Sequence, residues 1–211
     1  MKMNKDKKRI VLTTLICLLP IIYGLIVWDK LPEQVPTHWG ADGEINGYSS
    51  KAFAVFGLPV FLAFINVIAN VAILADPKRV NHSDKMKALV AWFVAVLSLI
   101  VVPICLMAAQ GILLNVSLIV SLLVGVVLLI IGNYLPKCKR NYTIGIKLPW
   151  TLDSDENWNR THRLAGYVWT VGSILCILAA LFGQMMLMLP VVILMTIIPC
   201  IYSFILYRKG I

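Results

Sequence analysis

Charged residues are scarce in this chain of 211 residues, and none lies in its long apolar stretches. Only 14% of the residues are Asp, Glu, Lys or Arg, whereas 60% are hydrophobic, a composition too apolar for a water-soluble domain of this length. All ten acidic residues and all three histidines fall between or outside the apolar stretches. Proton relays and coupled-ion sites normally need ionisable groups inside the membrane, so the pattern disfavours an ion-driven pump.

Familiar catalytic and metal-binding motifs are also missing. The sequence has no C-x-x-C, H-E-x-x-H, G-x-S-x-G or G-x-x-x-x-G-K-[ST] motif. Four of the five cysteines lie in apolar stretches, where a cysteine is typically a small buried residue. A membrane-bound enzyme using His38 or His162 is the weakest interpretation, and we expect no catalytic residue, cofactor or metal.

Long apolar stretches dominate what is present. A helix needs about 20 mainly apolar residues to cross roughly 30 Å of hydrocarbon. Six stretches meet this requirement, at about 10–28, 53–75, 88–109, 112–135, 164–184 and 187–207. The first is too long for a signal peptide and is followed by no small-x-small cleavage site, and its Pro20 is expected to kink or start a helix. The prediction is an all-α membrane protein with a bundle of six transmembrane helices.

The basic residues predict the orientation of this bundle. If the six spans alternate, all Lys and Arg residues except Lys30 and Lys51 lie on one side, which the positive-inside rule makes cytoplasmic. Both termini are then cytoplasmic. The net charge of +9 indicates topology and attraction to membrane lipids, and we expect no direct contact with nucleic acid. The predicted regions are a basic tail at 1–9, two spans at 10–75 with an outer loop at 29–52, an inner loop at 76–87, two spans at 88–135, an inner loop at 136–163 and two spans at 164–207.

Uncharged polar residues inside the spans leave two interpretations open. Asn66 and Asn70 are four residues apart and share one helix face, and Ser98, Ser117 and Ser121 lie in later spans. Hydrogen bonding between helices is the favoured role. The alternative is an uncharged pathway, in a transporter or channel for a small molecule or a lipid.

The outer loop is too elaborate for a simple linker. Pro32 and Pro36 stiffen it, and Asp42-Gly43 and Asn46-Gly47 are turn pairs that reach positive φ readily. We therefore expect an ordered hairpin-like cap, with Trp39 and Tyr48 as interfacial anchors. His38 has no second metal-ligating residue at a suitable spacing, so a structural role is favoured.

The segment 132–166 is the most informative inner region. Pro136 is expected to end the fourth span, and Asp153 with Glu156 has the spacing of a capping box for a short helix. Trp158 and His162 share a face of that helix. One interpretation is an interfacial helix with Trp158 among the headgroups and with Arg160 and Arg163 at lipid phosphates. The other is a surface that docks a protein.

Both loops carry motifs of a known family. The sequence LPEQVPTHWGADGEINGYSSK at 31–51 resembles the DUF1648 motif, and GNYLPKCKRNYTIGIKLPWTLDSDENWNRTHRLAGYVW at 132–169 resembles the carboxy-terminal signature of the SdpI-type membrane proteins. The family often has Arg-Thr where this chain has Lys147-Leu148. Lys keeps the charge but loses the planar fork of Arg, so a bidentate contact is not expected there.

The resemblance implies a multi-pass protein of a Gram-positive-type cell membrane that confers immunity to a secreted peptide toxin. It also implies signal transduction, in which an SdpR-type winged-helix repressor is held at the membrane. The motif residues that would face the toxin are Leu31, Pro32, Pro36, His38, Trp39, Gly43, Gly47 and Lys51. Those that would face the cytoplasmic partner are Asn133, Pro136, Asn141, Tyr142, Gly145, Lys147, Pro149, Trp150, Thr151, Trp158, Thr161 and His162.

Overall fold

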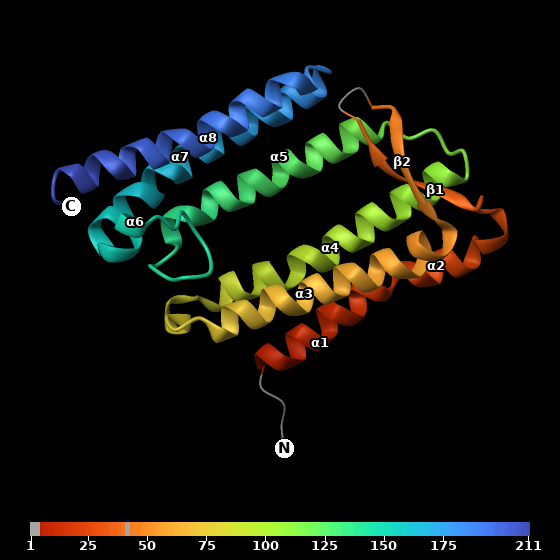
Figure 1. The fold of residues 1–211 in the computed structure, drawn as a ribbon, viewed down its shortest axis with the longest axis horizontal. Helices are drawn as coiled ribbons and strands as arrows, with labels where there is room; N and C mark the ends of the chain where they lie inside the picture. The colour runs from red at the N-terminus through yellow and green to blue at the C-terminus, as the bar shows by residue number, and fades with distance from the viewer. Residues whose placement is uncertain (1–4, 41–42) are drawn as a thin grey trace. The chain divides into compact units, whose positions relative to one another are not determined.

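The computed structural model describes residues 5–40 and 43–211, and these contain six helices long and apolar enough to cross a membrane (Figure 1). They are Lys5–Ile26, Phe53–Ala75, Asp84–Ala109, Val116–Lys137, Asp155–Leu181 and Met185–Arg208, which confirms the predicted six spans. The chain forms two compact units. The first comprises residues 1–75 and 83–116, and the second comprises residues 76–82 and 117–211.

The first unit is built on three long helical segments and a hairpin. Its helices are α1 (Lys5–Leu18), α2 (Pro20–Ile26), α3 (Leu58–Ala75) and α4 (Asp84–Ala109). A π-helical turn, Phe53–Gly57, leads into α3. Pro20 starts α2 as expected, because a proline cannot supply the backbone N–H that a continuous helix needs there.

The helices of the first unit are joined by buried polar side chains. Asn66 is fully buried on α3, and its Nδ2 donates to Oγ1 of Thr13 on α1 at 3.0 Å. Asn70 donates to the Asn66 carbonyl at 2.8 Å. The Ser98 hydroxyl on α4 donates to the Cys17 carbonyl at 2.8 Å. The bonds of Asn66 and Ser98 confirm the predicted hydrogen bonding between helices, whereas the bond of Asn70 lies within α3.

The opposite face of α3 is apolar and exposed. Phe61, Phe64, Ile68 and Val71 are between 48% and 60% exposed, while Asn66 on the same helix is fully buried. A helix that points its polar side chains inward and its largest apolar side chains outward is adapted to lipid. Exposure of such an apolar face to water would be unfavourable, whereas lipid chains solvate it.

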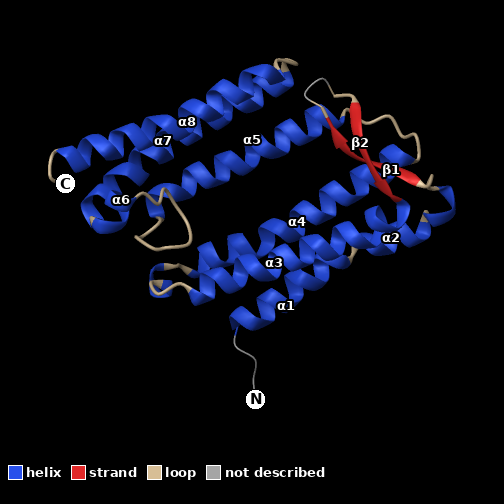
Figure 2. Cartoon of the chain, in the orientation of Figure 1, coloured by secondary structure: helices blue, strands red, loops and turns tan. Residues whose placement is uncertain are grey.

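The outer loop forms the predicted hairpin. Strands β1 (Gln34–Trp39) and β2 (Ile45–Ser50) pair antiparallel, as Figure 2 shows. Gly43 has the expected positive φ, at 87°, and closes a turn onto the Gly40 carbonyl, whereas Asp42 lies outside the described residues. The expectation of a second turn at Asn46-Gly47 is wrong, because both residues lie within β2 and Gly47 faces the Cβ of His38.

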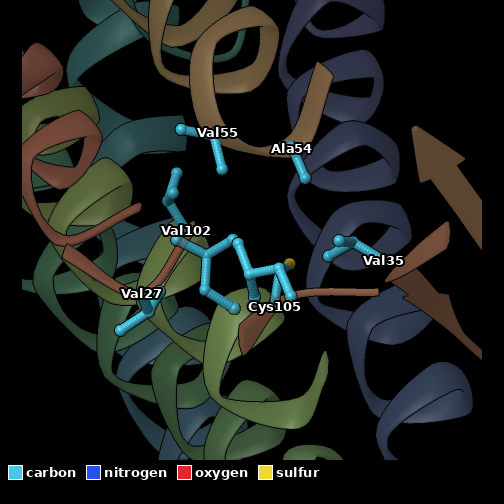
Figure 3. Close-up of a cluster of buried hydrophobic side chains, with 8 residues drawn as sticks. Val27, Val35, Ala54, Val55, Val102 and Cys105 are labelled. Carbon is cyan, nitrogen blue, oxygen red and sulfur yellow. The ribbon is translucent and has the colours of Figure 1, made fainter. Parts of the chain in front are cut away.

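A buried apolar cluster attaches the hairpin to the helices of its unit. Val35 of β1 is fully buried among Val55, Val102 and Cys105, and Val27 completes the group at the end of α2 (Figure 3). One face of the hairpin is thereby fixed on α4. At roughly 25 cal/mol for each Å² of buried apolar area, each such valine contributes about 1.5–3 kcal/mol.

The second unit comprises α5 (Val116–Tyr134), α6 (Pro149–Asp153), α7 (Asp155–Leu181) and α8 (Met188–Arg208). Helices α7 and α8 pack along each other (Figure 1). A single 3-10 turn, Leu135–Lys137, extends α5 and contains Pro136, close to where the fourth span was expected to end.

The start of α7 differs from the prediction. The cap is Ser154, whose Oγ accepts a hydrogen bond from the backbone N–H of Asn157 at 3.2 Å, and Asp153 is instead the last residue of α6. The expected short helix is also continuous with the fifth span. Hydropathy placed the start of this span at residue 164, because the first turns of α7 are polar. In the structure, polar side chains of these turns form hydrogen bonds within the protein.

Candidate functional site

The segment between α5 and α7 folds over the first turns of α7. Trp158 and His162 stack with ring centroids 4.0 Å apart, as their shared helix face predicted. The Trp158 indole donates to the carbonyl of Cys138 at 2.7 Å, and Nε2 of His162 accepts from the backbone N–H of Ile146 at 3.0 Å. Both ends of the 138–146 loop are thus held by one pair of rings.

His162 is a structural residue in this arrangement. Its Nε2 faces a backbone donor, and its Nδ1 lies 2.8 Å from the Trp158 carbonyl, which is an acceptor. A neutral ring with its proton on Nδ1 satisfies both neighbours. The ring is 1% exposed, so it reaches neither solvent nor a substrate, and the interpretation as an enzyme gains no support from it.

Gly145 allows the loop to approach these rings. Its φ is +120°, and a Cβ at this position would lie 2.5 Å from Nε2 of His162 and 3.0 Å from the Trp158 ring. Any L-residue would therefore be strained by its backbone conformation and would also overlap its neighbours. The glycine in the motif has a specific packing function.

Two side chains fold the loop locally. Oδ1 of Asn141 accepts from the backbone N–H groups of Thr143 and Ile144 at 2.9 and 2.7 Å, which is the pattern of an Asx turn. The Thr151 hydroxyl donates to the carbonyl of Ile146 at 2.8 Å and accepts from the N–H of Leu148 at 2.8 Å. Thr151 thereby joins the loop to the first turn of α6.

Helix α6 is attached to α8 by Trp150. Its indole donates to the Ser203 hydroxyl at 2.6 Å, and its ring stacks on Tyr207 with centroids 5.7 Å apart. The Ser203 hydroxyl donates in turn to Oδ1 of Asn157 at 3.0 Å, and Thr161 donates to the same oxygen at 3.1 Å. The network is buried and satisfied, so it makes α6, α7 and α8 one rigid support.

A buried carboxylate holds the loop from the α3–α4 connection. Oδ2 of Asp76 accepts from the Thr143 hydroxyl at 2.5 Å, from the N–H of Tyr142 at 3.0 Å and from Nε2 of His82 at 3.2 Å. Oδ1 of Asp76 accepts from the N–H of Lys78 at 2.7 Å. We call these four contacts the Asp76 clamp.

The clamp favours the ionised form of its carboxyl. Burial by itself raises the pKa of Asp76, but the hydrogen bonds from Thr143, Lys78, His82 and Tyr142 outweigh it and lower the pKa from 3.8 to about 2. A depressed pKa means that the clamp stabilises the fold fully above about pH 4, and that this contribution is lost as the pH falls toward 2. It amounts to roughly 2 kcal/mol.

Burial divides the inner motif residues into two groups. Asn141, Thr151, Trp158, Thr161 and His162 are buried and hold the loop together, so the interpretation that places Trp158 among the headgroups is wrong. Gly145 and Trp150 are half-buried. Those that reach the surface are Asn133, Pro136, Tyr142, Lys147 and Pro149.

The sequence reasoning missed Asp76, His82 and Ser203. Asp76 and Ser203 bond to residues 46 or more positions away in the chain, and His82 bonds to Asp76, which no motif marks.

The hairpin residues divide in the same way. Leu31 and Pro36 are buried, Pro32 and His38 are exposed, and Trp39, Gly43, Gly47 and Lys51 are half-buried. Nδ1 of His38 donates to Oδ1 of Asn46 at 2.5 Å, a contact across the hairpin. The Lys51 ammonium lies 4.6 Å from the centroid of the Trp28 ring, a cation–π contact at the base of β2.

Comparison with known proteins gives two family matches and one relative. The SdpI/YfhL protein family matches residues 137–203, and a domain of unknown function, DUF1648, matches residues 15–63. Immunity protein SdpI of Bacillus subtilis (strain 168) is 28% identical over 211 positions, which cover 96% of this chain and 97% of that protein. No solved structure matches the chain. The hairpin and most of the loop fall inside the family matches, whereas Asp76 and His82 fall outside both.

Proposed function

Because this chain is similar to the SdpI/YfhL protein family and to an immunity protein, we propose that it is a multi-pass membrane immunity protein that protects its own cell against a secreted peptide toxin. The observation that carries the proposal is similarity to an immunity protein along nearly the whole chain, including both elaborate loops. Six apolar helices support a site of action in the cell membrane.

The hairpin is the surface that we propose for the toxin. It is fixed on α4 through Val35, so it presents a defined face, and every residue of β2 is exposed or half-buried. The accessible members of the predicted set are Pro32, His38 and the half-buried residues around them. A preformed surface loses little conformational entropy when a peptide binds.

A finer proposal concerns the inner loop, where an SdpR-type winged-helix repressor would be held. Tyr142, Lys147 and Pro149 are exposed on a loop whose interior is fixed by Trp158 and His162. A basic and aromatic surface on a rigid support suits a protein partner. Transfer of a signal between the two loops requires that toxin bind two conformations of the protein with different affinity.

The uncharged pathway remains the alternative function. Its sequence support came from polar groups in the spans. Asn66 and Ser98 are used in hydrogen bonds between helices of the first unit, and Asn70 bonds to Asn66 within α3. Flux of small solutes into liposomes containing the purified chain would test it.

Immunity can be tested by expression in a strain that the toxin kills. Cells with the inserted chain should survive and keep their membrane potential, while cells with the empty vector should lose both. Membrane insertion is checked by immunoblotting of washed membranes. Undiminished killing despite normal insertion would rule out the proposed immunity function.

A further inference from the structure

The α3–α4 connection packs against the 138–148 loop. Helix α3 ends at Ala75 and α4 begins at Asp84, and both helices belong to the first unit. The connection between them, residues 76–82, packs within the second unit. Its Asn81 donates to the carbonyl of Arg140 at 2.6 Å, and its Asp76 accepts from Tyr142 and Thr143.

We propose that Asp76 is a positioning residue, which links the α3–α4 connection to the 138–148 loop and thereby sets the exposed face of Tyr142. The inference rests on the proposed function only in taking this face as the surface that binds a protein partner. Asp76 follows the last residue of α3 directly, and its carboxylate accepts a hydrogen bond from the backbone N–H of Tyr142 in the loop.

The geometry around Tyr142 supports this role. Its backbone N–H is held by Asp76, while its ring is 48% exposed and has the Lys78 ammonium 5.3 Å from its centroid. Asp76 and Lys78, which contact the backbone and the ring of Tyr142, both belong to the α3–α4 connection. The side chain of Asp76 is fully buried, so it contacts no partner itself and acts through the loop.

The chemistry of the clamp requires a carboxylate. Asp76 accepts four hydrogen bonds and donates none, with donors at both of its oxygens. An asparagine of the same shape has one acceptor oxygen and one amide that must donate. Whichever way the amide is turned, a backbone N–H loses its acceptor, that of Lys78 or that of Tyr142, so Asp76→Asn should release the loop.

Cys138 is a native reporter for the state of this loop. It is 7% exposed, with Asn141 donating to its sulfur at 3.5 Å, whereas the other four cysteines lie in α1, α4, α7 and α8. Burial raises the pKa of the Cys138 thiol, which further slows its reaction with a maleimide. The reaction should accelerate when the loop opens.

The test is the rate at which a charged maleimide labels Cys138 in open membrane fragments that contain the full chain. Because the reagent reaches both membrane faces in such fragments, the result does not depend on orientation, toxin or partner. We expect Asp76→Asn to raise the rate about tenfold when labelling is carried out well below the temperature of global unfolding, which the loss of the clamp itself lowers by several degrees. Asp153→Asn, which removes an exposed carboxylate of the same region, is the matched control and should keep the native rate.

A second pair of variants keeps the carboxylate in place. Thr143→Val removes the hydroxyl that donates to Asp76 and should raise the labelling rate, whereas Thr143→Ser retains a hydroxyl and should restore the native rate. Native rates in both Asp76→Asn and Thr143→Val would overturn the proposal. If the variants label as expected but the unsubstituted chain confers no immunity, the result counts against the proposed function alone.

Discussion

Gly145 is the residue at which the motif constrains the loop most directly. Its positive φ and the closeness of His162 and Trp158 act together, since the conformation that brings the backbone to the rings is also the one that an L-residue avoids. The sequence predicted Gly145 as a site residue through family resemblance. The structure supplies the reason, which is room for two stacked rings.

Replacement of Gly145 by alanine should lower the free energy of unfolding of the purified protein by roughly 2 kcal/mol or more. About 1–2 kcal/mol comes from the backbone conformation, and the rest from displacement of the His162 ring. Gly183→Ala is the matched control, because Gly183 also has a positive φ, +70°, but a Cβ there meets no atom within 4 Å. Unfolding measurements in detergent that gave both variants the same cost would contradict the packing role of Gly145.

At the scale of elements, the short helix α6 depends on α8 for its position. It has five residues, too few to be stable as an isolated helix, and Trp150 connects it to Ser203 and Tyr207. The sequence predicted that Trp150 takes part in binding a partner. In the structure the ring faces α8, so its influence on a partner would be exerted through the placement of α6 and the neighbouring Lys147.

The proposed inner surface predicts that Trp150→Ala inserts normally but no longer recruits an SdpR-type repressor to the membrane, measured with a fluorescent fusion of the repressor. Trp169→Ala is the control, because the Trp169 indole also donates to α8, at the Met195 carbonyl at 2.8 Å, but lies 19 residues further along the chain. Recruitment that survives Trp150→Ala, or that fails equally in both variants, would remove α6 from the proposed inner surface.

At the scale of the whole molecule, the apolar exterior and the charge distribution are both explained by a membrane environment. Apolar side chains solvated by lipid need no protein partner, and the positive-inside rule predicts that the cationic side chains lie at the inner leaflet. The structure supports the six spans by length and composition, and the orientation stays a prediction from the sequence.

Orientation predicts opposite accessibility for two exposed residues. In intact cells, a membrane-impermeant maleimide should label Tyr48→Cys in the hairpin and should leave Lys147→Cys unlabelled until the membrane is opened. Labelling of Lys147→Cys from outside would invert the topology. The surfaces assigned to toxin and repressor would then exchange sides.

Several features followed from local sequence alone. The six spans follow from apolar length, the hairpin from Pro32, Pro36 and the turn at Gly43, and the shared face of Trp158 and His162 from helical spacing. Each of these depends on residues close together in the chain, and local physics determines them without knowledge of the fold.

Tertiary structure alone decided which motif residues face inward and what holds them. Asp76 meets Tyr142 and Thr143 across 66 and 67 residues, and Trp150 meets Ser203 across 53. A hydrogen bond between such distant residues forms only after the helices have packed, so no local pattern indicates it. For the same reason the sequence marked Trp158 as interfacial, although packing buries it as the centre of the loop.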